Sequence, residues 1–363
     1  MKSLSCLLAC TVALYQGNDV RLLENLRDAY VDHLLVPPGH EPPDSLKLAL
    51  ESAGVAILRA GPETEVIDNG LWPGLRANIV SDQQRDIGFA AATAEPWVNE
   101  NGWILLHARG VAPRKRTVLT YSPPRDLAPK IGANALAIAK AAVFGGAYAV
   151  PASALAESAT PRGRADRRRT IAQLKFIADH PDWFSGDIQS TVDVLTDSLA
   201  PVREIMNLLV RRNLPFRAFA RDHWPADRPA ALVLVGQPPL GSSEQARVLA
   251  WRSAGTAILE RTSVSDPSSF AAEVRSALGD RRPFRLTNAQ EVIAVLSVGK
   301  QRVLHLLNYG IDPIQGVRVQ LTQEPSRAMM FTPEKPSGVA LEIHHGEIFI
   351  PEMGVSCAIV LKD

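Results

Sequence analysis

Residues 132–151 read GANALAIAKAAVFGGAYAVP. Small and apolar residues dominate positions 132–140, as in a helix that is buried on most of its surface. The segment then passes through Phe144-Gly145-Gly146 into the short apolar run 147–151. A helix that leads directly into a strand is the repeating unit of an α/β fold.

The same alternation extends from the start of the chain to about residue 185. Because strands that alternate with helices lie parallel and are joined by right-handed crossovers, we expect one parallel sheet here. The strand-like runs are residues 9–15, 33–37, 55–60, 89–94, 117–121 and 147–151. Six runs are fewer than the eight strands of a closed (β/α) barrel. Residues 1–187 are therefore predicted to form a barrel-like, incomplete domain, which would be the catalytic domain of an enzyme.

A second unit is predicted over residues 188–282. Strand-like runs at 192–195, 215–220, 231–235 and 256–259 alternate with helical patterns at 200–212 and 242–253. This order is typical of a doubly wound, flavodoxin-like domain. A flavin or nucleotide would need an anion site at the first turn, but that turn lacks the glycines that let a backbone approach phosphate, and Asp197 would repel it. We expect a structural domain without a cofactor.

From residue 283 onward the pattern changes to alternation of apolar and polar residues. Short strands are predicted at 292–296, 303–307, 317–321, 339–343, 347–350 and 356–361, with Gly and Pro between them. Short, evenly spaced strands indicate a small antiparallel β-sandwich. The fold class is thus multi-domain α/β followed by an all-β domain at 283–363.

Several stretches carry a family resemblance. VLHLLNY at 303–309, VRVQL at 317–321 and IFIPEMGV at 348–355 look like the closing strands of the sandwich of many glycoside hydrolases. The helix at 200–212 with the following Asn213-Leu214-Pro215-Phe216 is similar to their trimerisation-type domain. The order of the three units resembles glycoside hydrolases of the family 42 β-galactosidase type. These motifs are architectural, so they indicate a lineage and not an activity.

The resemblance implies two catalytic carboxylates at the carboxyl ends of barrel strands. Cleavage of a glycosidic bond needs one carboxyl group that gives a proton and a second that attacks or activates water. Glu95 follows the run 89–94 and precedes Pro96, which places it at the catalytic face of a barrel. It is the leading candidate. The same position also suits an acid that caps a helix beginning at Pro96.

The second acid has no equally good candidate. Glu100 lies about one helical turn after Pro96 and is the chosen partner of Glu95. Asp82 and Asp86, in the polar loop upstream, are alternatives. For each of these three acids a solvated surface role is the competing interpretation.

Aromatic and amide side chains near Glu95 suggest a sugar-binding surface. Trp72 and Trp97 are predicted to offer apolar platforms to a sugar ring, and Asn99 to bind its hydroxyl groups. A carbohydrate is therefore the expected ligand.

Composition argues against several other classes. Lys and Arg number 39 against 38 Asp and Glu, so no global field attracts nucleic acid. The arginines at 162–169 have no interleaved aromatics and indicate a solvated helix start. The three cysteines lack metal-ligand spacing, and no run approaches the ~18 apolar residues of a membrane span. We expect no metal, no nucleic acid and no membrane span.

The first residues imitate a signal peptide weakly. The apolar stretch before Cys10 is short for such a segment, and no small-x-small site follows Tyr15. The same residues suit a buried first strand, so a cytoplasmic location is favoured over export.

Two functions remain open. The first is a glycoside hydrolase-like protein that acts on an oligo- or polysaccharide through a carboxylate pair. The alternative is a catalytically degenerate carbohydrate-binding or assembly subunit of the same architecture. In both, the middle domain would serve homo-oligomer contacts.

Overall fold

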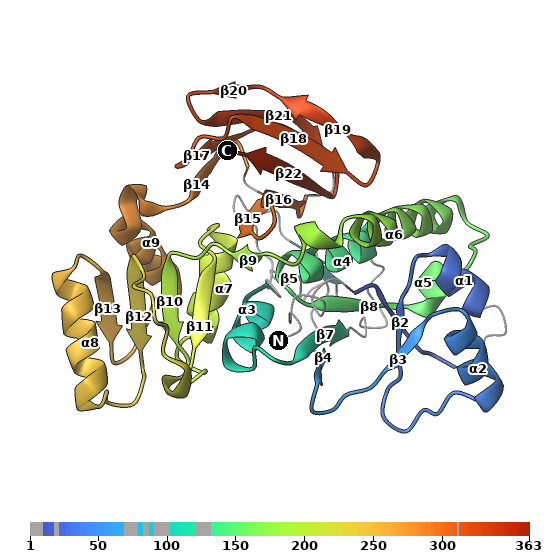
Figure 1. The fold of residues 1–363 in the computed structure, drawn as a ribbon, viewed down its shortest axis with the longest axis horizontal. Helices are drawn as coiled ribbons and strands as arrows, with labels where there is room; N and C mark the ends of the chain where they lie inside the picture. Colours follow the sequence, from blue (N-terminus) through green and yellow to red (C-terminus); the bar gives the residue numbers. More distant parts are fainter. Residues whose placement is uncertain are drawn as a thin grey trace.

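The computed structural model describes residues 10–17, 22–68, 79–82, 87–90, 102–120, 132–289, 291–310 and 312–363, with the backbone alone at 79–82 and 87–90. Figure 1 shows a barrel-like α/β part on the right, a smaller α/β part on the left and an all-β part above them. The predicted fold class, α/β followed by all-β, is confirmed.

The barrel-like sheet is built from β1 (Val12–Leu14), β2 (His33–Leu35), β3 (Ala56–Leu58), β4 (Thr64–Asp68), β7 (Arg116–Thr120) and β8 (Ala147–Pro151). The strands lie parallel in the order β3-β2-β1-β8-β7-β4. The last strand, β8, pairs with the first, β1. A (β/α) barrel is wound in this way, with its last strand beside its first.

The sheet is open between β3 and β4, which are consecutive in the chain but form its two edges. Only residues 59–63 join them. Parallel neighbours need a crossover of about a dozen residues or more. The short connection therefore prevents β3 and β4 from pairing, and the barrel-like sheet stays incomplete, as expected.

The strand expected at 89–94 is not part of this sheet. β6 (Ile87–Ala90) pairs antiparallel with β5 (Ile79–Asp82) in a separate two-stranded sheet. The four-residue connection 83–86 favours a local hairpin over a crossover. β4, which the sequence analysis missed, is the sixth strand of the parallel sheet instead.

Six helices accompany the barrel-like sheet. They are α1 (Leu22–Asp28), α2 (Asp44–Ser52), α3 (Gly102–Val111), α4 (Ala133–Val143), α5 (Ala152–Leu155) and α6 (Pro161–Asp179), followed by the 3₁₀ turn η2 (Pro181–Trp183); the count covers the described ranges. Every residue of α4 is buried, because it is covered by α6, β8 and the all-β part. Its alanine-rich sequence allows this close packing on all sides.

The arginines at 162–169 lie on the first turns of α6. Thr160 caps this helix by accepting a hydrogen bond from the Gly163 amide at 3.1 Å. Arg164 and Arg167 donate to the carbonyl oxygens of Ala159 and Leu155, at 2.7 and 2.8 Å. The cluster therefore marks the start of a helix, and two of its members bind the chain that precedes it.

The smaller α/β part contains a four-stranded parallel sheet in the order β11-β10-β12-β13. Its strands are β10 (Val192–Leu195), β11 (Phe216–Phe219), β12 (Ala231–Val235) and β13 (Ala257–Arg261); its helices are α7 (Arg203–Arg211), η3 (Arg221–His223), α8 (Ser242–Ser253), α9 (Pro267–Leu278) and η4 (Gly279–Arg281). The strand order changes direction at β10, as in a doubly wound sheet. All residues of β10 and β12 are buried, which explains their continuous apolar runs.

The all-β part consists of two antiparallel sheets, β14-β17-β21-β20 and β19-β18-β22-β16-β15-β9. The strands are β9 (Asp187–Ile188), β14 (Phe284–Thr287), β15 (Val292–Val298), β16 (Arg302–Asn308), β17 (Ile314–Leu321), β18 (Arg327–Thr332), β19 (Lys335–Leu341), β20 (Ile343–His344), β21 (Glu347–Met353) and β22 (Ser356–Lys362). Alternate residues of β17 and β21 point into one apolar core shared by the two sheets. This alternation produced the period-two pattern in the sequence.

Close contacts join the three parts. The side-chain amide of Asn213 donates to the Val292 carbonyl oxygen and accepts from the Ala294 amide, at 3.2 and 2.7 Å, which ties the smaller α/β part to β15. On α3, a Cβ at Gly110 would lie 2.1 Å from the Ala218 carbonyl oxygen of β11. Ser356 donates to Gln173 of α6 at 2.7 Å. The parts thus meet through polar contacts and through close packing of the backbone.

No helix within the described ranges combines the length and the hydropathy that a membrane crossing requires. The domain limits 187/188 and 282/283 stay predictions. The two-residue strand β9, at the first of them, pairs with β15 of the all-β part.

Candidate functional site

The carboxyl edge of the barrel-like sheet is the first candidate site. Its six described strands end at Leu14, Leu35, Leu58, Asp68, Thr120 and Pro151. Asp68, at the end of β4, is the one acidic residue in that set, and it is solvent-exposed. Barrel enzymes place their reacting groups on this face. Asp68 was missed in the sequence because TEVID, with acids at two of five positions, does not stand out as a buried strand.

A second acid, Glu41, follows β2 on the same edge but is engaged. The guanidinium of Arg59, just after β3, donates to both carboxylate oxygens of Glu41 at 3.2 and 2.9 Å. Lys47 of α2 lies 3.6 Å from Glu41 and 3.1 Å from Asp44. This arrangement holds the loops after β2 and β3 together and leaves Glu41 flanked by two cations.

The residues predicted from the sequence, Trp72, Glu95, Trp97, Asn99 and Glu100, lie outside the described residues, as does Asp86. Asp82 ends β5, of which the backbone alone is described. Between Asp68, at the end of β4, and Gly102, at the start of α3, the structure describes only the backbone of β5 and β6.

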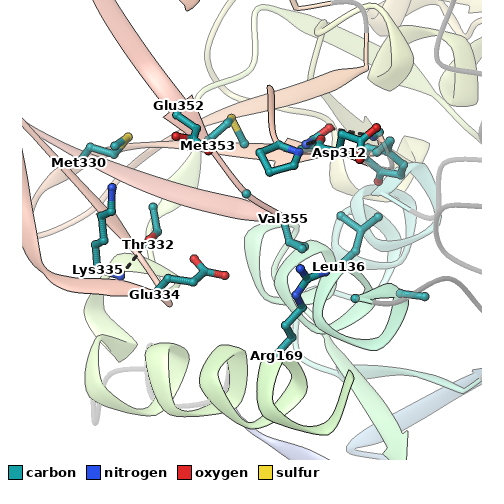
Figure 2. A pocket seen from close by; sticks show the side chains of 17 residues that line it. Leu136, Arg169, Asp312, Met330, Thr332, Glu334, Lys335, Glu352, Met353 and Val355 are labelled. Carbon is teal, nitrogen blue, oxygen red and sulfur yellow. Dashed lines mark hydrogen bonds between the residues drawn. The ribbon is translucent and has the colours of Figure 1, made fainter. Parts of the chain in front are cut away.

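The second candidate site is a cavity of about 310 Å³ between the all-β part and helices α4 and α6. Figure 2 shows Arg169 and Leu136 on the helix side and Glu334, Lys335 and Glu352 on the strand side. The lining residues are Gly132, Ala133, Leu136, Arg169, Asn308, Tyr309, Gly310, Asp312, Pro313, Met330, Thr332, Glu334, Lys335, Glu352, Met353, Gly354 and Val355. No sequence motif predicted this cavity, because its lining residues come from segments that are far apart in the chain.

The carboxyl edge of the smaller parallel sheet is filled by the protein's own side chains. Asp197 accepts a hydrogen bond from the Arg221 amide at 2.9 Å and pairs with the guanidinium of the same residue. The side chain of Gln237 accepts from the Ser198 amide and donates to its carbonyl oxygen, both at 2.9 Å. A phosphate at this turn would meet the Asp197 carboxylate.

Earlier on β10, Asp193 is paired in register with Arg217 of β11. Arg217 donates to the two carboxylate oxygens of Asp193 at 2.9 and 2.7 Å, and to Asp227 at 2.7 Å. Burial raises the pKa of Asp193 to about 6, against the opposing effect of Arg217. Asp193 is buried and Arg217 is partly exposed, and the pair joins β10 to β11, which indicates a role in stability.

His305 of β16 is a buried base at the junction of the all-β part and η2. Its Nε2 lies 3.0 Å from the Trp183 carbonyl oxygen, to which the neutral ring donates. Burial lowers the pKa of His305 to about 4, and the hydrogen bond to Trp183 opposes this only in part. Burial likewise raises the pKa of Cys10 to about 11 and of Cys357 to about 12, which disfavours the nucleophilic thiolate form of both. Among the described residues, no group of His, Cys, Asp and Glu forms a metal site.

Comparison with known proteins supports the fold. No protein-family model and no curated sequence matches the chain. Its structure is similar to an α-L-fucosidase, isoenzyme 2, from Paenibacillus thiaminolyticus, with a TM-score of 0.52 and 11% identity over 94% of this chain and 79% of that one. It is also similar to a β-galactosidase from Rahnella sp. R3, with a TM-score of 0.51 and 9% identity over 98% of both chains. The chain therefore has a glycoside hydrolase-like fold.

Proposed function

We propose that this protein is a glycoside hydrolase that acts on an oligo- or polysaccharide through a carboxylate pair at the carboxyl edge of its barrel-like sheet. One observation carries the proposal: the barrel-winding order β3-β2-β1-β8-β7-β4 occurs in a chain that overlays nearly end to end with a β-galactosidase. The lineage is proposed to be that of family 42. The substrates of the two structural relatives, α-L-fucosides and β-D-galactosides, are the first to test.

In this proposal Glu95 gives the proton to the leaving oxygen, and a second acid attacks the sugar or activates water. Glu100 is the partner inferred from the sequence. Asp68 is a further candidate, because it ends a barrel strand at the point where the chain leaves the sheet toward Glu95. Trp72, Trp97 and Asn99 are proposed to bind the sugar. A separation of about 5–5.5 Å between the two acids would give retention of configuration, and ~6.5–9.5 Å inversion.

The test is turnover of chromogenic α-L-fucosides and β-D-galactosides by the native protein and by Glu95→Gln. Loss of one of two catalytic carboxylates should lower turnover by about 10²-fold or more. The control is Glu63→Gln, an exposed acid just before β4, at the opposite end of the strand that ends in Asp68. Equal rates for native protein and Glu95→Gln would remove Glu95 from the site.

The second candidate function is a carbohydrate-binding subunit without turnover. It is favoured by the open seam between β3 and β4, and by the ion pair of Glu41 with Arg59 at the same edge. This function predicts that galacto- and fuco-oligosaccharides bind, as measured by calorimetry, while none is cleaved. Cleavage that Glu95→Gln abolishes would exclude it.

We also propose that the smaller α/β part serves homo-oligomer contacts. Leu249 on α8 is 57% exposed, which leaves an apolar side chain on the outer helix of this part. Light scattering after size exclusion, with Leu249→Glu as the variant, tests this: the variant should run at a lower mass than the native protein.

A further inference from the structure

The cavity between the all-β part and helices α4 and α6 is apolar at its floor. Met330 and Met353 are 3% and 1% exposed, and Leu136 of α4 is 5% exposed. They come from β18, β21 and α4, so the floor exists only where the all-β part meets the barrel-like part. Its volume of about 310 Å³ is at the small end of ligand pockets, which run from about 300 to 1,000 Å³.

The rim of the cavity is charged and unpaired. Arg169, Asp312, Glu334, Lys335 and Glu352 all line it and are all solvent-exposed. Within the described structure, the side chains of these five residues form no hydrogen bond and no ion pair, with each other or with any neighbour. Three acids and two bases thus surround an apolar floor without neutralising one another.

The walls are preorganised by backbone contacts. The side chain of Asn308 donates to the Asp312 carbonyl oxygen at 2.9 Å and accepts from the Gly310 amide at 2.8 Å, which fixes the loop that carries Asp312. The Thr332 hydroxyl accepts from the Lys335 amide at 3.0 Å and fixes the turn that carries Glu334. The charged side chains therefore project from defined backbone positions.

The mixed charge of the rim restricts the class of ligand. An anion would be repelled by three carboxylates, and a cation would meet Arg169 and Lys335. A neutral polyhydroxylated ring suits all five groups, because each hydroxyl donates to a carboxylate or accepts from a cation. The apolar C–H face of such a ring fits the methionine floor.

We propose that this cavity is a second carbohydrate site, which takes a mono- or disaccharide at the junction of the all-β part with α4 and α6. The proposal goes beyond the function proposed above, and it does not require turnover at the barrel-like sheet. The described residues alone form the site.

The test uses the full chain with D-galactose, L-fucose and lactose as probes. Hydrogen exchange should slow at residues 308–313 and 353–355 in saturating sugar, because the bound ring shields these loops. The variant Arg169→Gln/Glu352→Gln should bind at least about tenfold more weakly in calorimetry, since charge-assisted hydrogen bonds are lost. The matched control is Arg168→Gln/Glu324→Gln, which changes an exposed arginine beside Arg169 and an exposed glutamate of the all-β part, both outside the cavity lining.

Different results would overturn the proposed carboxylate pair at the barrel-like sheet and the proposed second carbohydrate site. Glu95→Gln should keep the slowed exchange at 308–313, whereas Arg169→Gln/Glu352→Gln should keep any hydrolysis of small chromogenic glycosides. Binding of all three sugars with equal affinity by the native chain and the Arg169→Gln/Glu352→Gln variant would overturn the second site. So would protection confined to the barrel-like part, or no binding of any probe at about 50 mM, well above a dissociation constant of about 1 mM.

Discussion

The two parallel sheets of this protein have the same strand geometry, but their carboxyl edges differ. In the smaller sheet, the carboxyl edge is filled by Asp197, which binds the backbone amide of Arg221, and by Gln237, which binds the backbone of Ser198. In the barrel-like sheet, the same edge carries Asp68 and Thr120 at the ends of β4 and β7, and long connections lead from there to α3 and α4. An edge closed by its own side chains serves stability, whereas an edge with an exposed acid and long connections is available for chemistry.

The largest effect is expected inside the smaller sheet, at Arg217→Met. This change leaves the Asp193 carboxylate, 1% exposed, without its ion pair, which typically costs about 3–5 kcal/mol. Urea unfolding of the variant should show the loss, and Arg252→Met on the exposed face of α8 should not. The double variant Asp193→Leu/Arg217→Met should recover most of the stability, because no charge is then buried. A double variant as unstable as the single one would contradict this account.

The loss in Arg217→Met should also depend on pH. Burial raises the pKa of Asp193 above its ordinary value, so the folded state takes up a proton more readily than the unfolded state. Stability of the variant should therefore rise as the pH falls from 7 toward 5. A penalty that stays constant over this range would mean that Asp193 is not the group responsible.

The next largest effect on stability is expected from protonation of His305, a buried base with no ion pair in the described structure. Its pKa of about 4 in the folded state lies below the ordinary 6.5, so the unfolded state binds the proton first. Stability should be lost as the pH falls from about 6.5 to 4, by up to roughly 3 kcal/mol. His305→Gln, which can still donate to the Trp183 carbonyl oxygen, should flatten this dependence. The same pH profile in both proteins would contradict the assignment.

Sequence patterns and structure agree where one face or both faces of an element are buried. The runs at 192–195 and 231–235 coincide with β10 and β12, because continuous apolar strands are typical of a buried parallel sheet. β4 was missed because Glu65 and Asp68 interrupt its apolar pattern, and β6 was assigned to the wrong sheet because a short apolar run does not reveal its partner. The cavity was missed because Arg169 and Glu352 are 183 positions apart and meet only after the parts dock.

A smaller effect is expected at the closed edge, with Asp197→Ala. The change removes the acceptor of the Arg221 amide and the partner of its guanidinium, which should cost about 1–2 kcal/mol in urea unfolding. Sugar binding and turnover should not change if this edge is structural, as predicted. Loss of either function at unchanged stability would reverse the roles assigned to the two edges.

The smallest effect on stability is expected for Asp68→Asn, at the carboxyl edge of the barrel-like sheet. This variant is also the most direct test of the comparison between the two edges. An exposed acid without a described partner should change unfolding by less than about 0.5 kcal/mol. If Asp68 is the second acid of the proposed pair, turnover should nevertheless fall by about 10²-fold or more. Glu63→Gln, at the other end of β4, should leave both quantities unchanged. Asp68 and Glu63 lie at opposite ends of the short strand β4 and differ mainly in the edge of the sheet that they occupy. Equal turnover of Asp68→Asn and Glu63→Gln would therefore leave Glu100 as the partner of Glu95.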